Sequence, residues 1–225
     1  MTRDSSIADH PPRHVIVIGH PVPGSFNHAI ADHYCRTVRD AGQEAVIRDL
    51  YALDFDPRLR GNRFPEHHTA MSMDVAQELG LLREADAIVF VYPIWFGMPP
   101  AMIKGYVDRV MGAGLTPAAI SHGIQDSILA GKSLATFSTS AASSIWLDEH
   151  GQMEAVRKAF DRYLMAVFGM TDAGHEHFGS LAPDSEDGLA RHYLTQVEER
   201  ARVTCMGLTA KRGADQRRLL LATSD

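Results

Sequence analysis

Short apolar runs alternate along the chain with longer stretches in which apolar residues recur every three or four positions. The continuous runs at residues 14–19 and 87–92 are typical of strands that are buried on both faces of a parallel sheet. Further strands are predicted at residues 132–138 and 170–178, and residues 44–50 indicate a strand at the edge of the sheet.

Helical spacing separates these strands. Apolar residues fall on one helical face around residues 30–41, 75–82, 102–110, 153–167 and 189–201. Because strands return to a parallel sheet through right-handed crossovers, the helices cover both of its faces. We expect an α/β fold, a three-layer sandwich built on a five-stranded parallel sheet.

A single domain is expected over residues 14–205. Residues 1–13 mix charges with prolines and lack the apolar region of a signal peptide, so we expect a disordered leader. Residues 206–225 are weakly basic, and we expect a solvated C-terminal tail.

Composition narrows the range of functions. The 225 residues are 45% hydrophobic and 22% charged with a formal net charge of −6, which argues against disorder and against a nucleic-acid partner. No segment reaches the roughly 18–20 apolar residues that span a bilayer, so we expect no membrane insertion and a cytoplasmic location. Cys35 and Cys205 form no CxxC motif, which excludes a disulfide scaffold and a cysteine-built zinc site.

Ligands of such sheets bind at the carboxyl ends of the strands, so the loops there are the candidate sites. In the first loop, Gly24 permits a tight turn, and Ser25 and Asn27 are good residues for a helix start. Amides at a helix start suit a phosphate, to which His20 could donate a further hydrogen bond. An ordinary turn with a helix cap explains the same residues equally well. No P-loop or G-x-G-x-x-G motif is present.

Two further loops follow the third and fourth strands. Trp95 and Phe96 could line a flat apolar ligand such as a flavin ring, or could simply plug the end of the sheet. The small and hydroxylated residues 138–144 could approach the pyrimidine end of a flavin, although a serine-rich loop is itself common. Three such loops on one edge favour a ligand site.

The chain resembles the NAD(P)H:quinone oxidoreductase family, which has the flavodoxin-like fold. The resemblance is carried by His20 with residues 25–27, 49–51, 92–96 and 100–105, and it covers roughly residues 14–202. It implies the strand order 2-1-3-4-5. It also implies a flavin, NAD(P)H as co-substrate, and a homodimer with the flavin at the interface.

The family assigns residues to the parts of the flavin. Its diphosphate-binding loop matches His20, Phe26 and Asn27, beside Ser25. Its ring-binding segment matches Pro93, Ile94, Trp95 and Phe96, and its pyrimidine-end stretch matches Thr139, Ser140, Ala141 and Ala142. Arg191 stands where the family has an arginine near adenine, which favours FAD over FMN while leaving FMN open.

The catalytic residues depart from the family pattern. Mammalian members carry a tyrosine and a histidine beyond the pyrimidine-end stretch. Trp146 stands nearest the tyrosine, and His150 matches the histidine only with a gap. Trp146 and His150 are therefore the catalytic candidates, although a histidine at the start of a helix is an equal alternative for His150. The identity of the substrate does not carry over.

The leading hypothesis is a flavin-dependent NAD(P)H oxidoreductase that reduces quinones or related acceptors by ping-pong hydride transfer. The alternatives are a flavin-binding ancillary subunit of a potassium-efflux transporter and a flavodoxin-type electron carrier. Two histidine pairs, at residues 67–68 and at His175 with His177, could approach a metal ion. Neither pair has a third ligand at a suitable spacing, so we expect no metal.

Overall fold

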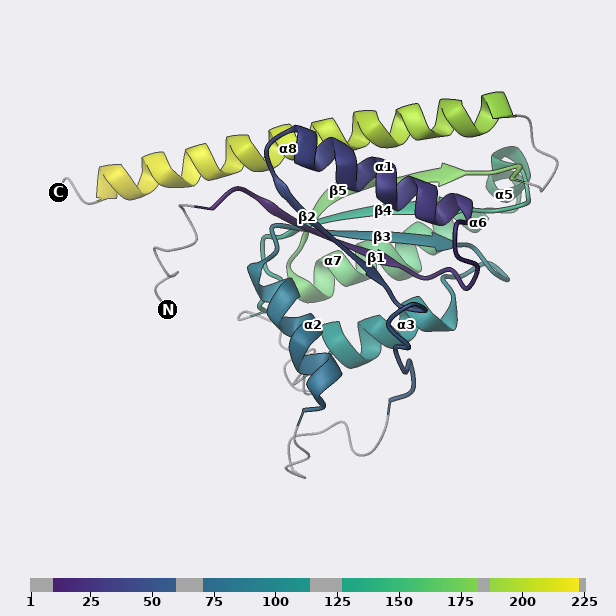
Figure 1. Ribbon diagram of the computed structural model, residues 1–225, viewed down its shortest axis with the longest axis horizontal. Coiled ribbons are helices and arrows are strands. Elements are labelled where there is room, and N and C mark those ends of the chain that lie inside the picture. Colours follow the sequence, from purple (N-terminus) through teal and green to yellow (C-terminus); the bar gives the residue numbers. More distant parts are fainter. Residues whose placement is uncertain (1–9, 60–70, 114–126, 182–186, 223–225) are drawn as a thin grey trace.

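A computed structural model of the protein describes residues 10–59, 71–113, 127–181 and 187–222 (Figure 1). Its strands form one parallel sheet in the order β2-β1-β3-β4-β5. They are β1 (Arg13–Ile18), β2 (Glu44–Asp49), β3 (Ala87–Pro93), β4 (Ser133–Thr139) and β5 (Thr171–Phe178). The expected α/β class, sheet and strand order are confirmed, and each predicted strand ends within one position of the observed strand.

Helices cover both faces of the sheet (Figure 1). On one face lie α1 (Phe26–Asp40) and α8 (Asp187–Ala222); on the other lie α2 (Met73–Glu84) and α3 (Ala101–Tyr106). Because side chains alternate along a strand, Val15 and Phe90 enter the core of the second face, whereas Ile16 and Val89 enter the core of the first. All four side chains are fully buried.

Two predicted helices contain a wider π-helical segment. The helix expected at residues 102–110 continues from α3 into η3 (Val107–Met111). The helix expected at residues 153–167 divides into α6 (Gln152–Val156), η4 (Arg157–Arg162) and α7 (Tyr163–Phe168). A short helix that the pattern does not predict, α5 (Ser144–Glu149), precedes them and is capped by the side chain of Ser143.

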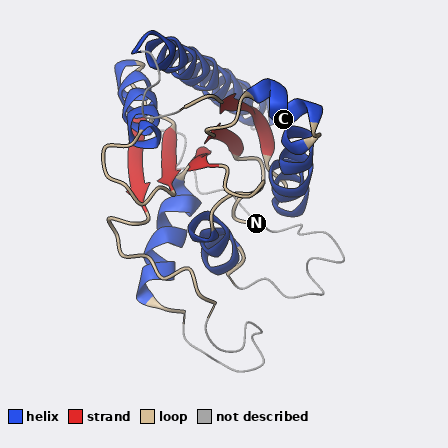
Figure 2. Ribbon diagram, turned by 90° about the vertical axis from the view of Figure 1, so that its right-hand side faces the viewer, coloured by secondary structure: helices blue, strands red, loops and turns tan. Residues whose placement is uncertain are grey.

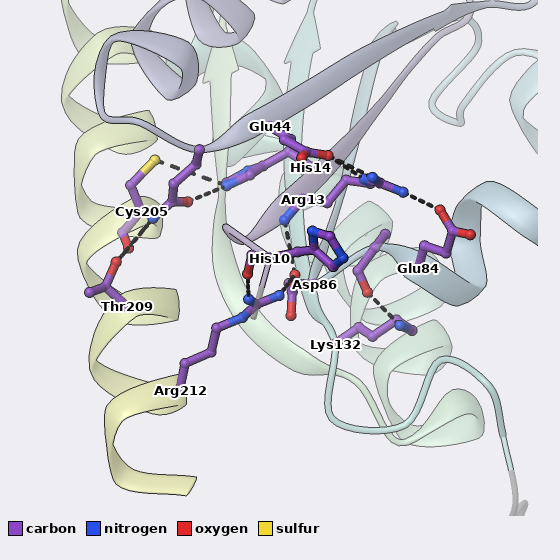
Figure 3. Close-up of polar contacts among 12 residues, drawn as sticks. His10, Arg13, His14, Glu44, Glu84, Asp86, Lys132, Cys205, Thr209 and Arg212 are labelled. Carbon is purple, nitrogen blue, oxygen red and sulfur yellow. Dashed lines mark hydrogen bonds and ion pairs between the residues drawn. The ribbon is translucent and has the colours of Figure 1, made fainter. Parts of the chain in front are cut away.

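The last helix is longer than its apolar pattern predicts, since α8 runs to Ala222. The segment expected to be a solvated tail is therefore helical as far as the structure describes it, and it contacts the amino ends of the strands (Figure 3). Thr209 accepts a hydrogen bond from Gln43 at 3.0 Å, and Arg212 pairs with Asp86 at 2.7 Å. The expected leader falls on residues 1–9, which lie outside the described residues, and on the residues leading into β1.

None of the helices in the described ranges combines the length and the apolar character that a membrane span needs.

Candidate functional site

The loops after β1, β3 and β4 meet at the carboxyl edge of the sheet, toward which Figure 2 is viewed. Thr139, at the end of β4, joins all three. Its hydroxyl accepts a hydrogen bond from the side-chain amide of Asn27 at 3.0 Å, and its carbonyl accepts one from the backbone N–H of Ile94 at 2.7 Å. The rings of His20 and Trp95 lie 6.3 Å apart across the first two loops. The expected juxtaposition of the three loops is present.

The start of α1 has no side-chain cap. Ser25 occupies the N-cap position, but its hydroxyl hydrogen-bonds the His28 ring at 2.8 Å instead of a backbone amide. The opposite nitrogen of His28 contacts Asp49 at 3.0 Å, and the first turn of α1 contains no acidic residue. The first amides of a helix have no intrahelical acceptor, and the helix dipole adds positive potential there. This arrangement suits an anion such as a phosphate.

His20 lies beside this helix start. Its Nδ1 accepts a hydrogen bond from the Val22 amide at 3.1 Å, so Nε2 is the nitrogen that can meet a ligand. Burial lowers the pKa of His20, against a smaller opposing effect of the Val22 carbonyl. A neutral ring with Nδ1 as acceptor carries its proton on Nε2 and can donate it to a phosphate oxygen.

Phe26 and Asn27 contribute to the site through their backbone. The Phe26 ring packs 6.3 Å from Phe178 and 6.4 Å from Tyr193, centroid to centroid, and is turned toward the core. The Asn27 side chain is 3% exposed and is engaged with Thr139. Both side chains therefore hold the loop in place, and their amides lie at the helix start.

The turn after β3 displays an aromatic side chain in a strained conformation. Trp95 and Met98 exchange two backbone hydrogen bonds, of 3.0 and 3.1 Å, around Phe96 and Gly97. Phe96 has φ +48° and Gly97 has φ +81°, and a left-handed aromatic residue is rare outside strained turns. The Phe96 side chain is fully exposed and Trp95 is 42% exposed, so these rings do not plug the end of the sheet. Pro93 is buried and Ile94 packs against the core, so both support the turn.

The turn after β4 is closed by its own polar groups. The Ser140 hydroxyl donates to the Ala142 carbonyl at 2.7 Å, and the Ser140 amide donates to the Phe178 carbonyl at 3.0 Å. Ala141 is exposed at the tip, and Thr139 is buried beneath it. The turn thus exposes the small side chain of Ala141 at its tip.

The two catalytic candidates lie next to each other. The Trp146 and His150 rings stack at 4.1 Å with 26° between their planes, and His150 Nδ1 donates to the Trp146 carbonyl at 2.7 Å. His150 caps the end of α5 and lies directly before Gly151, the N-cap of α6, so it stands between the two helices and its position next to a helix start remains an alternative explanation. Gln152 donates to the Gly97 carbonyl at 2.7 Å and so holds this segment against the turn after β3. Both candidate rings are exposed to solvent.

Arg191 lies near the start of α8, which begins at the same edge of the molecule (Figure 1). It is exposed, and its carbonyl accepts a hydrogen bond from the Thr195 hydroxyl at 3.1 Å. Tyr193 anchors this part of α8 to the site, because its hydroxyl donates to the Gly179 carbonyl at 3.1 Å.

A buried polar chain lies behind the turn after β4. His175 Nδ1 is 2.5 Å from Asp161 and its Nε2 is 2.7 Å from the Ser138 hydroxyl. The Ser138 hydroxyl is also 2.8 Å from His177 Nδ1, and His177 Nε2 is 3.0 Å from the Ser140 hydroxyl. The period of two along the strand places both histidines on one face, but only the fold reveals that Ser138 and Asp161 join them.

Of the two histidine pairs, the described ranges include only His175 with His177. No group of three or more His, Cys, Asp or Glu side chains there could hold a metal ion. His67 and His68 lie outside the described residues. On the same face as Ser138, the Tyr92 hydroxyl is buried and has no hydrogen-bond partner among the residues described. Its pKa is raised well above the usual value by burial and by the charge of Asp161.

Comparison with known proteins places the chain in a family. The family model described as "Flavodoxin-like fold" matches residues 12–201. A Haemophilus influenzae protein named as an uncharacterized NAD(P)H oxidoreductase is 28% identical over 170 residues, which are 75% of this chain and 84% of that protein. The NAD(P)H dehydrogenase (quinone) 1 of Rattus norvegicus is 27% identical over 165 residues, which are 64% of this chain and 60% of the rat protein.

Solved structures agree on the fold. An NAD(P)H:quinone oxidoreductase from Methanothermobacter marburgensis matches with a TM-score of 0.67 at 23% identity, covering 84% of this chain and 94% of that one. An FMN-dependent NADH-azoreductase from Bacillus anthracis, in complex with FMN, matches with a TM-score of 0.64 at 15% identity, covering 86% and 99%. The expected resemblance to NAD(P)H:quinone oxidoreductases is confirmed, and the chain belongs to the flavodoxin-like fold family.

Proposed function

We propose that the protein is a flavin-dependent NAD(P)H oxidoreductase that reduces quinones or related acceptors by hydride transfer in a ping-pong cycle. The observation that carries the proposal is the pairing of an uncapped helix start with an exposed aromatic turn on one edge. Ser25 leaves the α1 amides without a side-chain cap, and Phe96 is held fully exposed in a left-handed conformation. Thr139 links the two loops.

The residues present fit a flavin. The amides at the start of α1 and His20 Nε2 would meet its phosphate end. Trp95 and Phe96 offer apolar rings to its flat face, and the turn at residues 139–142 offers small side chains and a hydroxyl to its pyrimidine end. When bound, a flavin would supply the chemistry of hydride transfer between NAD(P)H and the acceptor.

Residues of this chain would bind and orient the flavin and the acceptor and keep water away from the hydride transfer. The turn of Trp95 to Met98 is fixed by its paired backbone hydrogen bonds and by Gln152, so its rings hold a defined position. His150 donates through Nδ1 to a carbonyl, so its Nε2 is the nitrogen that can meet a ligand at the open edge. Trp146 stacks on His150 and restricts its ring. We assign His150 the stabilisation of charge as the acceptor is reduced, and Trp146 the support of that ring.

Cofactor type and assembly belong to the same proposal. Arg191 at the carboxyl edge favours FAD, and the relation to the FMN-dependent Bacillus anthracis protein makes FMN the competing outcome. Phe96, Trp95 and Trp146 stand exposed at this edge, so one chain alone leaves the site open. A homodimer with the flavin at its interface would cover these rings and remove their apolar surface from water. We place the protein in the cytoplasm.

The purified full-length protein tests the proposal directly. A visible absorption spectrum should show a bound flavin, and chromatography of the released cofactor against FAD and FMN standards should identify it. Anaerobic mixing with NADH or NADPH should bleach the spectrum, and a simple quinone should restore it. A colourless protein that takes up neither added FAD nor added FMN would overturn the proposal.

A further inference from the structure

A continuous chain of hydrogen bonds runs through the fold from Asp161 to the turn after β4. Its order is Asp161, His175, Ser138, His177 and Ser140, and successive links measure 2.5, 2.7, 2.8 and 3.0 Å. Ser138 is fully buried and Asp161 is 5% exposed. Buried polar groups are costly unless each is paired, so a chain of this length inside an α/β core needs a reason.

Two local irregularities of the backbone build the chain. The pairing of β4 with β5 shifts register between Leu134 and Thr136, and Gly174 at the shift has φ +101°. This bulge brings His175 and His177 onto the face that carries Ser138. Asp161 meets them from η4, where the helix widens to π geometry. Bulges and π segments are both over-represented beside functional sites.

The chain can hold its protons in two complete arrangements. In the first arrangement, every donor points toward Asp161. His175 Nδ1 donates to Asp161, and the Ser138 hydroxyl donates to His175 Nε2. His177 Nδ1 donates to Ser138, and the Ser140 hydroxyl donates to His177 Nε2. In the second, one more proton sits on His175 Nε2 and all the later donors point the other way. Ser138 then donates to His177 Nδ1, His177 Nε2 donates to Ser140, and Ser140 donates to the Ala142 carbonyl.

The two ends of the chain are suited to opposite roles. His175 and Asp161 line a cavity of about 240 Å³ whose wall also contains Arg157, Arg162 and Asp172, so protons can reach this end from solvent. Ser140 lies in the turn that we assign to the pyrimidine end of the flavin. The Ala142 carbonyl also accepts from the Ser180 amide at 2.9 Å, so it stays satisfied when the Ser140 hydroxyl turns away.

We propose that this chain is a proton relay that stores a proton on His175 beside Asp161 and delivers it at the Ser140 hydroxyl. Each link passes one proton forward, so the proton that leaves Ser140 is replaced through His177 and Ser138 by the one lost from His175. The role of the relay rests on the proposed function: NAD(P)H, a quinone and one proton yield NAD(P)⁺ and a hydroquinone, and this proton must be supplied. His175, Ser138 and His177 act through Ser140 and are positioning residues.

The charges around His177 favour transfer over storage at that ring. Burial is the main cause that lowers the pKa of His177 to about 4, and the neighbouring His175 and Arg157 lower it further. Asp148 on α5 opposes them, and Asp161 faces His175 from η4. His177 therefore stays neutral near pH 7 and exchanges one tautomer for the other, while Asp161 supplies the countercharge for a proton on His175.

Nitrogen NMR of the imidazoles in the flavin-free full chain tests the relay without turnover. When the relay takes up its extra proton as the pH falls, the neutral His177 ring should switch from the Nδ1–H to the Nε2–H tautomer. Ser138→Ala removes the link between the rings, so His177 should keep one tautomer across the titration. The matched control is Ser133→Ala at the far end of β4, where the hydroxyl contacts Thr171 at 3.3 Å; this variant should keep the switch.

Turnover gives the second test. In the flavin-loaded protein, Ser138→Ala should slow single-turnover quinone reduction about tenfold and change its pH profile, because a positioned proton donor contributes at least this much. Flavin affinity should be unchanged, and Ser133→Ala should match the wild type.

The possible failures are distinguishable. If His177 in the wild-type protein keeps a single tautomer at every pH, the relay is overturned. This measurement uses the wild-type protein alone, so it does not depend on whether a variant folds. A tautomer switch that persists in Ser138→Ala would overturn it as well. A protein that binds no flavin would instead overturn the proposed function alone.

Discussion

The two edges of the sheet treat their polar groups in opposite ways. At the amino edge, charged side chains are paired across several elements (Figure 3). Asp86 accepts from the Arg13 backbone at 2.9 Å and from Arg212 at 2.7 Å, while Arg13 also bonds Glu44 at 2.7 Å. Beneath them the buried His14 ring is held between Tyr34 at 3.0 Å and Gln43 at 2.9 Å. This edge joins the start of the sheet to α1 and α8.

At the carboxyl edge, backbone amides and an aromatic side chain that could have partners within the protein face solvent instead. The α1 amides have no side-chain cap, and Phe96 exposes its whole ring. In a parallel sheet, the loops that follow the strands and the helix starts after them all lie at the carboxyl edge, so ligands bind there. The difference indicates that the amino edge contributes stability and that the carboxyl edge contributes binding. Substitutions at the two edges should therefore separate the two properties.

The largest effect is expected from His14→Leu at the amino edge. The change removes the ring that hydrogen-bonds the Tyr34 hydroxyl and the Gln43 side-chain oxygen inside the core, so the free energy of unfolding should fall by about 3 kcal/mol. Urea denaturation measures the loss, with the exposed His192→Leu on α8 as the control. Flavin affinity should stay within about twofold. A large loss of flavin affinity in protein that remains folded would break the proposed division between the edges.

Ser25→Glu is the counterpart at the carboxyl edge. A carboxylate at the start of α1 interacts well with the helix dipole but repels a phosphate, so flavin affinity should fall about 100-fold, or about 2.7 kcal/mol, with no loss of stability. Titration of the flavin-free protein with FAD measures the affinity, and thermal unfolding measures the stability. Gln196→Glu adds the same charge on the exposed surface of α8 and should bind FAD like the wild type. Unchanged affinity in Ser25→Glu would contradict the phosphate site.

Acid should destabilise the protein through buried histidines near both edges of the sheet. Burial lowers the pKa of His14, and that of His177 to about 4, below the ordinary 6.5. The unfolded chain therefore binds more protons as the pH falls, so stability that is complete above pH 6.5 is lost toward pH 4, by about 2 kcal/mol. The pH dependence of urea unfolding should be shallower in His14→Leu and in His177→Gln. A slope equal to that of the wild type in both variants would contradict this account.

The smallest effect is expected from Phe96→Asn. Positive φ at both central positions of the turn is typical of type I′ geometry, for which Asn-Gly is the preferred pair. The variant should be more stable by about 1 kcal/mol, because the left-handed strain is relieved. It should also raise the KM for the quinone, since an aromatic surface is lost. Thermal unfolding and steady-state kinetics measure the two; lower stability would mean that the exposed ring is not strained.

The apolar pattern predicts the central strands well because β1 and β3 are buried on both faces. In β3 every residue is buried, and such a run reads as a strand without any knowledge of its neighbours. The loops of the candidate site follow from the same strands, since their carboxyl ends meet at one edge. The strand order comes from the resemblance to a family, because the pattern along the chain says nothing about which strands pair.

Helix ends and irregularities are less predictable. The short α5 buries a single residue, Leu147, and depends on the cap from Ser143. The end of α8 depends on Arg212 reaching Asp86, a residue 126 positions earlier in the chain. Local spacing cannot identify Asp86 as the partner of Arg212, so the last turns of α8 are predicted to be a tail.

The sequence by itself determined the layers of this protein and the loops that carry its candidate ligand groups, because burial imposes a period that each segment records locally. Only the tertiary structure decided which polar side chains meet inside it. The bulge at Gly174 and the π turn at Asp161 bring His175 and Ser138 together, and such contacts depend on register and helix width across elements far apart in the chain. Hydrophobic periodicity carries no information about strand register or helix width.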